Sequence, residues 1–485
     1  MQLKELLHAI PVKEYRGLLD SEVSSLCLDS RKMEKDSLFV AIRGYQSDGH
    51  DYISQAIENG ALVIVLEEYP EHIHEKITYV LVDDSAYALG VIASNFYGNP
   101  STKLKLVGVT GTNGKTTVAT LLFNLFTKLG YKVGLLSTVQ NQIGEQILSS
   151  THTTPDPITL NALLNLMLDA GCDYCFMEVS SHAIVQQRIA GLIFAGGIFT
   201  NLTHDHLDFH ESFHNYLNAK KKFFDDLNRN AFALTNIDDR NGQIMLQNTF
   251  AYRKTYGLRQ IADFKCKIIE NHLDGMLLQV ENQEVWVKLV GEFNAYNLMA
   301  VYGSAILLEQ ETVKVLTALS EITGAPGRFE ILKANNGVTA IVDYAHTPDA
   351  VENVLKTINQ LKKTGNKVLT VLGCGGDRDK IKRPEMARVA ISLSDKVVLT
   401  SDNPRNEDPL VIIREMEAGV PVDKRKNVFS IADRKEAIRA AFHLASQGDI
   451  LLVAGKGHEN YQEVKGVRNH FDDKEELTKI FNEYI

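Results

Sequence analysis

Apolar runs alternate with helical patterns over the central part of the chain. From about residue 101 the runs LKLVGVT, VGLLST, YCFMEVS, GGIFTNL and AFALTN are bounded by turn residues and separated by residues at helical spacing. Apolar strands that alternate with helices are typical of a mostly parallel sheet covered on both faces. The pattern therefore predicts an α/β fold. A strand-rich stretch within residues 250–290, LLQVENQEVWVKL, predicts an inserted antiparallel element.

The last part of the chain repeats the alternation. The runs TAIVDY, KVLTVLG, KVVLTSD and DILLVAG are each followed by a polar loop and a helical pattern, which predicts a second, Rossmann-like α/β domain. Ligands in open α/β sheets bind at the carboxyl ends of the strands. The polar loops DYAHTPD, GCGGDRDKIKRPE, SDNPRNEDP and GKGHE follow these strands and therefore indicate a site.

Turn residues divide the chain at two points. They cluster at Tyr97-Gly98-Asn99-Pro100-Ser101 and at Gly324-Ala325-Pro326-Gly327. We therefore predict three domains, residues 1–100, 101–330 and 331–485. The first contains the short strand-like runs SLFVAIRG and ALVIVLEE, with helical patterns between them. Three domains suit the length of 485 residues, because one domain usually spans about 100–200 residues.

Composition narrows the class of protein. A net charge of −10 disfavours a nucleic-acid partner, because such binders usually carry a basic stripe. We expect no membrane insertion, since no run of about 18 apolar residues occurs and the first residues lack the apolar core of a signal peptide. Five scattered cysteines favour a reducing compartment, so we expect a cytoplasmic protein. Cys172 and Cys175 form a CxxC that could be a redox pair or half a zinc site, but it runs into an apolar strand pattern, and we favour a structural role.

The segment Gly108–Thr117, GVTGTNGKTT, has the features of a phosphate loop. It follows an apolar strand and precedes the helical pattern VATLLFNLF. Its glycines let backbone N–H groups converge on phosphate oxygens, and the helix N-terminus adds favourable partial charge. The strict pattern GxxxxGK[ST] fails at one place, where Val109 replaces the first glycine. The predicted ATP-binding residues are Gly111, Thr112, Asn113, Gly114, Lys115, Thr116 and Thr117, with Lys115 on the phosphates and the Thr116 hydroxyl on magnesium.

This loop resembles that of the Mur ligases and of their relatives, the folylpolyglutamate synthetases. The resemblance covers nearly the whole chain and rests on several separate motifs. It implies a substrate-binding domain, a central ATPase and a C-terminal domain that brings an amine. The implied reaction uses ATP to activate a carboxylate as an acyl phosphate, which requires cations and positioned donors around two anions.

Three further residues are candidates for the chemistry. Glu178 in MEVSSH and His206 in NLTHDHLDFH can ligate magnesium directly or through water. The resemblance implies that Lys220 in NAKKKFF is carbamylated by CO₂ and helps to hold magnesium, whereas the lysine taken alone could simply be solvated. The catalytic set is then Lys115, Glu178, His206 and Lys220, and the metal ligands are Thr116, Glu178, His206 and carbamylated Lys220.

A metallohydrolase is the alternative from another class. The segment His204–His210, HDHLDFH, nearly matches the HxHxDH metal signature, but Phe209 stands where the last histidine belongs. Such an enzyme would also leave the phosphate loop unexplained. We therefore expect His210 and His214 to be surface residues or to support other ligands. A nucleotide-binding module without catalysis is a third alternative, which Lys115, Glu178 and His206 oppose.

The resemblance also implies a UDP-linked muramoyl peptide substrate. Two N-terminal segments, LDSR and GYQSDG, look like uridine-nucleotide loops of the tripeptide-forming members, although alone they would be ordinary turns. His152 precedes Thr153 and Thr154 at a position where some family members carry asparagine. Arg188 suits substrate carboxylates, because a guanidinium pairs with them in bidentate fashion. The implied contacts to UDP-N-acetylmuramoyl-L-alanyl-D-glutamate are Ser30, Tyr45, Gln46, Ser47, Thr153, Thr154, Ser180, Gln186 and Arg188.

The remaining motifs imply a nucleotide pocket closed across a hinge and an amino-acid site. Asn294, Arg328, Asp343 and His346 would complete the ATP pocket when the C-terminal domain closes. The sequence DNPR matches a motif of the family members that add meso-diaminopimelate. Arg405 in this motif could bind the distal carboxylate of diaminopimelate. The implied amino-acid contacts are Arg378, Asp402, Asn403, Pro404, Arg405, Gly455 and Glu459. An enzyme that uses L-lysine and a folylpolyglutamate synthetase remain alternatives, and we expect a monomer.

Overall fold

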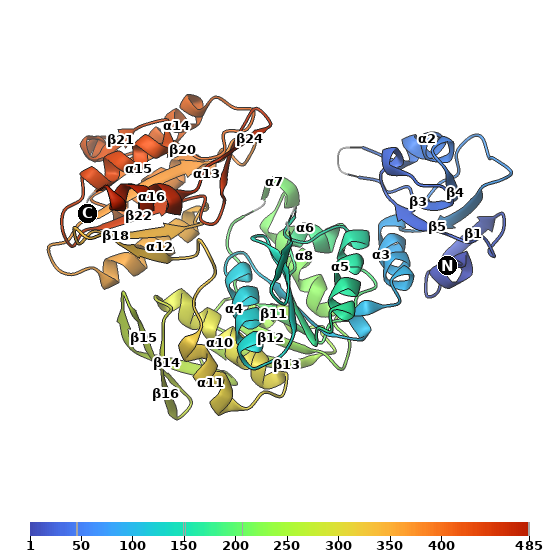
Figure 1. The fold of residues 1–485 in the computed structure, drawn as a ribbon, viewed down its shortest axis with the longest axis horizontal. Coiled ribbons are helices and arrows are strands. Elements are labelled where there is room, and N and C mark those ends of the chain that lie inside the picture. Colours follow the sequence, from blue (N-terminus) through green and yellow to red (C-terminus); the bar gives the residue numbers. More distant parts are fainter. Residues whose placement is uncertain (45–46, 149, 151, 206, 484–485) are drawn as a thin grey trace.

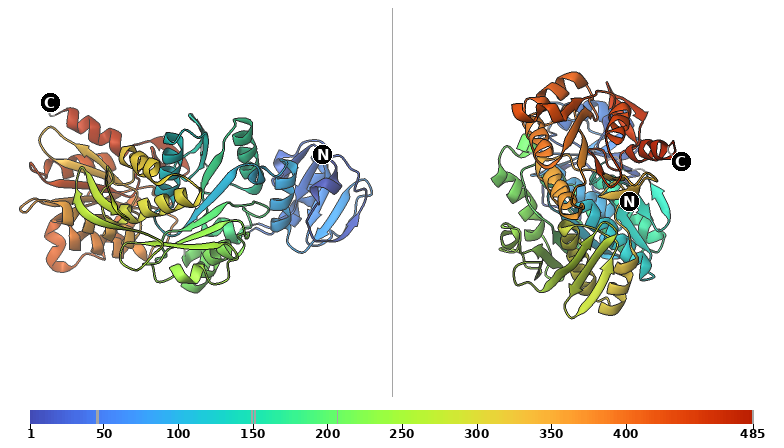
Figure 2. Two further views of the ribbon diagram at one scale, coloured as in Figure 1. Left: turned by 90° about the horizontal axis from the view of Figure 1, so that it is seen from below. Right: turned by 90° about the vertical axis from the view of Figure 1, so that its left-hand side faces the viewer.

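The computed structural model describes residues 1–44, 47–148, 150, 152–205 and 207–483. Figure 1 shows an elongated molecule with the N-terminal part at one end, the central part in the middle and the C-terminal part at the other end. The left view of Figure 2 also shows the N-terminal part standing apart from the rest. It meets the central part through α3 (Ser85–Phe96), which packs against α5 (Pro157–Asp169).

The N-terminal part is a small α/β sheet. Its strand order is β1-β5-β4-β3-β2, and only the β1–β5 pairing is antiparallel. The strands are β1 (Val12–Arg16), β2 (Ser25–Cys27), β3 (Ser37–Val40), β4 (Ala61–Leu66) and β5 (Thr78–Val82). The helices are α1 (Leu3–Leu6), α2 (Ile53–Glu58) and α3. The apolar runs predicted as strands thus form β3 and β4.

The central part contains a long mixed sheet in the order β16-β15-β14-β13-β12-β11-β6-β10-β7-β8-β9. Its middle, from β13 to β7, is parallel as predicted. These strands are β6 (Lys105–Thr110), β7 (Val133–Leu136), β10 (Tyr174–Glu178), β11 (Gly196–Phe199), β12 (Phe232–Asn236) and β13 (Tyr252–Gly257). Cys175 lies within β10 and is buried, like Cys172, and both thiols are free, in agreement with a structural role.

Antiparallel strands extend both edges of this sheet. At one edge lie β14 (Phe264–His272), β15 (Gly275–Val280) and β16 (Gln283–Val287), and at the other β8 (Asn141–Ile143) and β9 (Gln146–Leu148). The predicted antiparallel pairing is confirmed, and the strands extend the central sheet rather than forming a sheet of their own. Tyr256 and Gly257 of β13 pair in parallel with Phe264 and Lys265 of β14, so these strands continue the central sheet.

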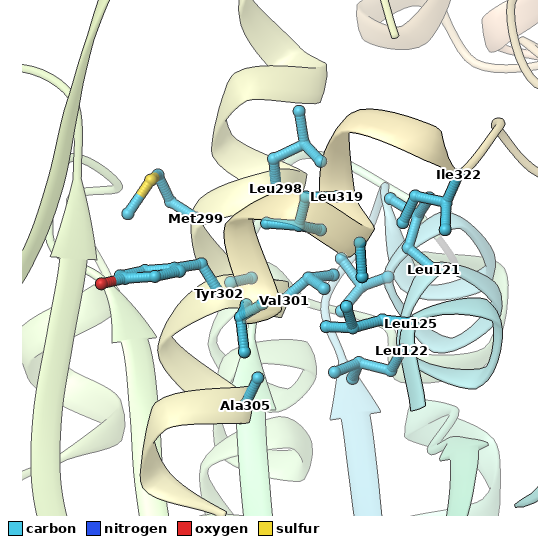
Figure 3. Packing of buried hydrophobic residues seen from close by; sticks show 14 of the residues in the cluster. Leu121, Leu122, Leu125, Leu298, Met299, Val301, Tyr302, Ala305, Leu319 and Ile322 are labelled. Atoms are coloured by element: carbon cyan, nitrogen blue, oxygen red, sulfur yellow. The ribbon is translucent and has the colours of Figure 1, made fainter. Parts of the chain in front are cut away.

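Helix packing fixes the phosphate loop against the rest of the central part. The remaining helices are α4 (Lys115–Lys128), α6 (Ser181–Val185), α7 (Leu207–His210), α8 (Phe213–Asp225), α9 (Gly242–Met245), α10 (Glu292–Leu307) and α11 (Thr312–Glu321). Figure 3 shows side chains of α4, α10 and α11 meeting in one buried cluster. The labelled members of this cluster are Leu121, Leu122, Leu125, Leu298, Met299, Val301, Tyr302, Ala305, Leu319 and Ile322. Removal of a buried leucine usually costs about 2–5 kcal/mol, so this packing stabilises the arrangement of α4 against α10.

The C-terminal part is an open sheet in the order β17-β18-β22-β19-β20-β21. It is parallel except for the β17 edge strand. The strands are β17 (Glu330–Lys333), β18 (Thr339–Asp343), β19 (Val368–Cys374), β20 (Lys396–Ser401), β21 (Val428–Ser430) and β22 (Ile450–Ala454), and a hairpin, β23 (Tyr461–Val464) and β24 (Val467–His470), follows. The helices are α12 (Pro348–Leu361), α13 (Lys382–Leu393), α14 (Pro409–Glu417), α15 (Arg434–His443) and α16 (Asp473–Asn482). In the described part of the chain no helix is both long and apolar enough to cross a membrane.

Candidate functional site

The phosphate loop lies between β6 and α4, in the strand–loop–helix arrangement that the sequence predicts. Gly114 is the N-cap of α4 with φ of 89°, and Gly111 has φ of 150°. A Cβ atom on Gly111 would lie 1.9 Å from Thr200 Oγ1, so only glycine fits there. Lys115 Nζ donates to the carbonyls of Gly111 (3.0 Å) and Thr112 (2.8 Å). The loop thus presents a lysine and a helix N-terminus, a combination suited to phosphate.

Thr116 and Glu178 form an oxygen-rich corner beside this loop. Thr116 Oγ1 donates to Glu178 Oε1 at 2.9 Å, and the buried Glu178 carboxylate ends β10. The backbone N–H of Thr138 donates to the same carboxylate oxygen at 2.7 Å. Magnesium prefers hydroxyl and carboxylate oxygens, so these side chains fit such an ion. Among the described residues no group of three His, Cys, Asp or Glu side chains forms a metal cluster, and His206 lies outside those residues.

Lys220 lies next to the phosphate loop rather than in solvent. It belongs to α8, is buried, and its Nζ donates to Gly111 O at 2.8 Å and Thr110 Oγ1 at 3.4 Å. Burial, followed by the charge of Lys115, lowers the pKa of Lys220 well below its usual range. Burial therefore favours the neutral, nucleophilic form of this amine.

The described histidines of the HDHLDFH segment, and the nearby His214, have different surroundings. His210 is buried, and its Nε2 lies 2.9 Å from Ser181 Oγ at the start of α6. His204 packs against the ring of Phe213, with centroids 5.2 Å apart. His214 is exposed. His210 therefore supports α6, which begins directly after Ser180.

A strip of polar side chains runs from Glu178 along the start of α6. Thr154 Oγ1 donates to the carbonyl of Glu178 at 2.8 Å, and Ser180 N donates to Thr154 Oγ1 at 3.2 Å. Thr153 accepts a hydrogen bond from Thr138 at 2.9 Å. The Arg188 guanidinium donates to Thr154 O at 2.8 Å and to Gln186 Oε1. Thr153, Thr154, Ser180 and Arg188 line the same cleft as Lys115, and so does the exposed His152.

The predicted N-terminal contacts lie elsewhere. Ser30 is buried and donates to Gln55 Oε1 at 2.7 Å, whereas Ser47 is exposed. Tyr45 and Gln46 lie outside the described residues. No described residue of the N-terminal part lines the two cavities of the central and C-terminal parts. Ser30 and Ser47 therefore belong to a part of the molecule that does not border these cavities.

A cavity of about 520 Å³ lies between α10, the phosphate loop and the start of α12, and we call it the hinge cavity. Asn113, Asn297, Arg328, Asp343, His346 and Asp349 are among its lining residues. Asn294 is buried behind it: its Nδ2 donates to Val290 O, and its Oδ1 accepts from Asn297 Nδ2 at 3.1 Å. Asn297, which follows Asn294 by one helical turn, is thus the nearer of the two to the phosphate loop. A Cβ atom on Gly114 would lie 2.7 Å from its Oδ1.

Sequence patterns missed several residues of this cavity. Asp238 accepts hydrogen bonds from the backbone N–H groups of Leu258, Arg259 and Gln260. It also accepts from the hydroxyl of Tyr296, at 3.0 Å. No motif marks Asp238 in the sequence, whereas Asp349 lies in the DYAHTPD segment and could have been found there.

The segment that follows the turn Gly324-Ala325-Pro326-Gly327 connects this cavity to the C-terminal part, and we call the turn and Arg328 the hinge segment. Arg328 Nη2 donates to Thr116 Oγ1 at 3.1 Å, and the guanidinium lies 4.3 Å from the centre of the Tyr344 ring. Asp343 accepts from the backbone N–H groups of Phe329 and Ala345, both at 2.7 Å, and burial raises its pKa. Burial, reinforced by the charge of Lys382, lowers the pKa of His346 to about 4, so this side chain is neutral at pH 7.

The C-terminal loops face the phosphate loop across a cleft of about 420 Å³, which we call the central cleft. Lys115, Glu178 and Lys220 line one side. The other side carries the predicted amino-acid contacts Arg378, Asp402, Asn403, Arg405, Gly455 and Glu459. Pro404 precedes Arg405 and packs on Gly376, where a Cβ atom would lie 1.9 Å from Pro404 O.

Charged groups of both signs are fixed on this second side. Asn403 Nδ2 donates to Glu459 Oε2 at 2.7 Å, and the fully buried Lys456 donates to Asn403 Oδ1 at 3.1 Å. Burial, followed by the charge of Asp402, raises the pKa of Glu459. Arg405 Nη1 donates to Gly376 O at 2.7 Å. Carboxylates beside arginines suit a ligand with ammonium and carboxylate groups. Lys456 lies in the GKGHE loop but was not predicted.

Comparisons with known proteins agree along the whole chain. Three family models match: the Mur ligase middle domain at residues 109–305, the Mur ligase glutamate ligase domain at 327–457 and the Mur ligase family catalytic domain at 22–97. The chain is 56% identical over 481 residues to UDP-N-acetylmuramoyl-L-alanyl-D-glutamate–2,6-diaminopimelate ligase of Phocaeicola vulgatus, with 99% of each chain covered. It is 57% identical over 475 residues to the enzyme of the same name from Cytophaga hutchinsonii, with 98% of each covered.

Solved structures give the same picture. A structure of UDP-N-acetylmuramoyl-L-alanyl-D-glutamate–2,6-diaminopimelate ligase matches with a TM-score of 0.71 and 30% identity, covering 100% of this chain and 99% of that one. Folylpolyglutamate synthase of Mycobacterium tuberculosis, complexed with ADP and AMPPCP, matches with a TM-score of 0.62 and 16% identity. That match covers 77% of this chain and 93% of the synthase, and it shows the fold alone.

Proposed function

This chain belongs to the Mur ligase family, and from that premise we propose that it is the ATP-dependent ligase that adds meso-2,6-diaminopimelate to UDP-N-acetylmuramoyl-L-alanyl-D-glutamate. One observation carries the proposal beyond the names of the relatives. The central cleft has the phosphate loop and Lys220 on one side and the DNPR loop on the other. An activated carboxylate on the first side would therefore face an amine held on the second.

The reaction consists of two displacements. An oxygen of the D-glutamyl carboxylate attacks the γ-phosphorus of ATP, the bond to ADP breaks, and an acyl phosphate forms. The amine of diaminopimelate then attacks the acyl carbon, loses a proton, and expels inorganic phosphate. Lys115 and the N-terminus of α4 would bind the phosphates. Arg328 reaches Thr116 from the hinge and adds positive charge only when the two parts are closed.

Thr116 and Glu178 would hold magnesium, and His206 and Lys220 are its further proposed ligands. When bound, the ion offsets the negative charge of the phosphates and the approaching carboxylate. Lys220 would contribute as a carbamate: its neutral amine nitrogen bonds to the carbon of CO₂ and loses a proton. The lowered pKa of Lys220 supports this assignment, because a protonated amine could not form the bond.

The remaining predicted contacts divide between the two substrates. Ser30 and Ser47, with Tyr45 and Gln46, would bind the uridine end at the N-terminal part. Thr153, Thr154, Ser180, Gln186 and Arg188 would bind the peptide end beside Glu178. Asn294 would act on the nucleotide through Asn297, which it orients. The proposed division of labour follows residues 1–100, 101–330 and 331–485, and we propose a cytoplasmic monomer.

Arg405 would receive the distal carboxylate of diaminopimelate. Arg378, Gly455 and Glu459 would bind its other end and the ammonium group there, with Asp402 and Asn403 beside them. L-lysine lacks that carboxylate, so binding it would leave a desolvated guanidinium without a partner. A folylpolyglutamate synthetase is disfavoured, because the matching synthase covers 77% of this chain rather than all of it.

Phosphate release from ATP tests the proposal directly. The full chain is mixed with ATP, magnesium and the UDP-muramoyl-dipeptide, and either meso-diaminopimelate or L-lysine is added. We expect strong release with diaminopimelate only. Release with L-lysine alone would retain the ligase and contradict the assignment of Arg405. No release with either amine would contradict the proposed substrate.

A further inference from the structure

An ion pair between buried Arg383 and partly exposed Glu407 lies next to the DNPR motif, outside the proposed substrate contacts. Arg383 is at the start of α13 with its side chain fully buried. Its Nη2 donates to Glu407 Oε1 at 2.8 Å, and its Nη1 donates to Glu407 Oε2 at 2.9 Å. This is a bidentate pair, in which both carboxylate oxygens are engaged. Glu407 follows Arg405 by two residues, so the pair anchors the segment that directly follows Arg405.

The same two groups also hold the neighbouring loop. The N–H of Asp377 donates to Glu407 Oε1 at 2.6 Å, and Arg383 Nη2 donates to Gly375 O at 3.2 Å. Gly375 and Asp377 belong to the loop after β19 that carries Arg378. Glu407 therefore joins the loop of Arg378 to the loop of Arg405, although the two loops follow different strands.

Arg405 is held in a strained conformation by the contacts between these loops. Its φ is 50°, in the left-handed region, which costs a non-glycine residue about 1–3 kcal/mol. Its Nη1 donates to Gly376 O at 2.7 Å, and its backbone N–H donates to Glu463 O at 3.0 Å. Asp377, also at positive φ (52°), accepts from Asn406 Nδ2 at 2.8 Å. Two strained residues on facing loops persist only when surrounding contacts fix them.

The charge of Glu407 is well suited to this task. Its hydrogen bonds with Arg383 lower its pKa to about 2, so the carboxylate is ionised at neutral pH. Lys380, on the same loop as Arg378, lies 3.3 Å from Glu407 Oε2. Two cations thus face this carboxylate: Arg383 on α13 and Lys380 on the loop after β19.

We propose that Glu407 is a positioning residue that sets the amino-acid specificity, because it fixes the loops of Arg405 and Arg378 at one separation. This inference rests on the proposed function, in which Arg405 receives the distal carboxylate of diaminopimelate and Arg378 binds its other end. A ligand held at both ends requires the two guanidinium groups at the right separation. Loosening their loops therefore weakens the binding of diaminopimelate, while L-lysine, which has no distal carboxylate for Arg405, loses less.

The structure offers a matched control at Glu415. This residue lies on α14, and its Oε2 accepts from Arg383 Nη1 at 2.5 Å. It thus contacts the same arginine as Glu407, but from a helix rather than from the specificity loop. A general loss of stability around Arg383 would appear in both variants, whereas a loss of loop position would appear only at Glu407.

The experiment compares the full-length Glu407→Gln, Arg383→Lys and Glu415→Gln variants with the wild type. We expect Glu407→Gln and Arg383→Lys to raise KM for diaminopimelate about 10-fold or more, since each breaks the bidentate pair. KM for ATP should stay within about twofold. The rate with L-lysine relative to diaminopimelate should rise in both variants, and Glu415→Gln should resemble the wild type.

Two results would overturn the inference. One is an unchanged KM and an unchanged lysine-to-diaminopimelate ratio in Glu407→Gln. The other is an equal loss in Glu415→Gln, which would make the pair merely stabilising. If the wild type itself fails with diaminopimelate, the proposed function is wrong. Amide hydrogen exchange of residues 375–379 then tests separately whether Glu407 positions the loop. Faster exchange in Glu407→Gln but not in Glu415→Gln supports the positioning of the loop, and equal exchange in both contradicts it.

Discussion

Asp349 accepts a hydrogen bond from Asn113, with Oδ2 and Nδ2 3.0 Å apart, and so joins the C-terminal part directly to the phosphate loop. Thr203 Oγ1 lies 3.4 Å from the same carboxylate oxygen. Asp349 is in the first turn of α12, and Asn113 precedes the N-terminus of α4. This contact and the bond from Arg328 to Thr116 hold the two parts together at the nucleotide site.

We expect Asp349→Ala to weaken closure of the C-terminal part. One hydrogen bond is usually worth about 0.5–1.5 kcal/mol, so kcat/KM for ATP should fall roughly 3- to 10-fold. Small-angle scattering should show a larger radius of gyration. Glu352→Ala is the control, because Glu352 lies on the same helix but pairs with Lys356 rather than with the phosphate loop. A wild-type rate together with a wild-type radius in Asp349→Ala would show that the contact contributes nothing to closure.

Two histidines of the C-terminal part predict a loss of stability in mild acid. Burial lowers the pKa of His346 to about 4 and that of His458 to about 3. Below about pH 6.5 the unfolded chain binds protons that the folded chain does not, so this stability is complete above about 6.5 and is lost as pH falls toward about 4. At about pH 5 each histidine should lower the free energy of unfolding by roughly 2 kcal/mol.

Urea unfolding at about pH 7.5 and about pH 5 measures this effect. His458→Gln should show a smaller decrease between the two pH values than the wild type. His214→Gln replaces an exposed histidine and should keep the wild-type decrease. Identical pH dependence in His458→Gln and the wild type would contradict a neutral, buried His458.

Lys220 and Lys222 provide a test of the carbamate. Lys220 is buried beside the phosphate loop, whereas Lys222, on the same helix, is exposed and pairs with Asp226 at 2.8 Å. Lys220→Ala should reduce phosphate release at least about 100-fold, because it removes a group near the transferred phosphoryl. Added short carboxylates should restore part of it, and Lys222→Ala should behave as wild type.

A second measurement does not depend on activity. With ¹³C-bicarbonate, the wild type should give a carbamate carbon signal that Lys220→Ala lacks and Lys222→Ala retains. Full activity of Lys220→Ala without rescue, or a carbamate signal that survives the substitution, would rule out the assignment.

The sequence predicted those parts of the site that local patterns encode. Apolar runs and turn residues located the strands, and the carboxyl ends of β19, β20 and β22 do bring Arg378, Arg405 and Glu459 to one cleft. Lys220 was found only through the family resemblance, because a lysine in a basic helical segment carries no local sign of burial.

Contacts between distant loops were not predictable in this way. Asn113 and Asp349 are separated by 236 positions, and no periodic pattern specifies which loops of two sheets will meet. Glu407 and Arg383 likewise resemble ordinary surface charges in the sequence. The antiparallel strands β14–β16 were recognised as strands, but their junction with β13 depends on hydrogen-bond register, which composition does not reveal.

The hinge provides a matched pair of glycines in the segment GAPG. Gly327 has φ of 64°, and a Cβ atom there would lie 2.1 Å from the backbone nitrogen of His458. At Gly324 the nearest atom to such a Cβ is Arg328 O, at 3.7 Å. Gly327→Ala therefore forces the hinge away from the GKGHE loop, and strain of this kind usually costs about 1–3 kcal/mol.

Because Arg328 follows Gly327 directly and donates to Thr116, this displacement should reduce activity as well as stability. We expect Gly327→Ala to lower both the melting temperature and kcat. Gly324→Ala should be neutral or slightly stabilising, since it restricts only the unfolded chain. Thermal unfolding and phosphate release on both variants test this. Equal behaviour of the two would mean that the hinge is not held by its contact with His458, and Arg328 would then be positioned by its contacts with Thr116 and Tyr344.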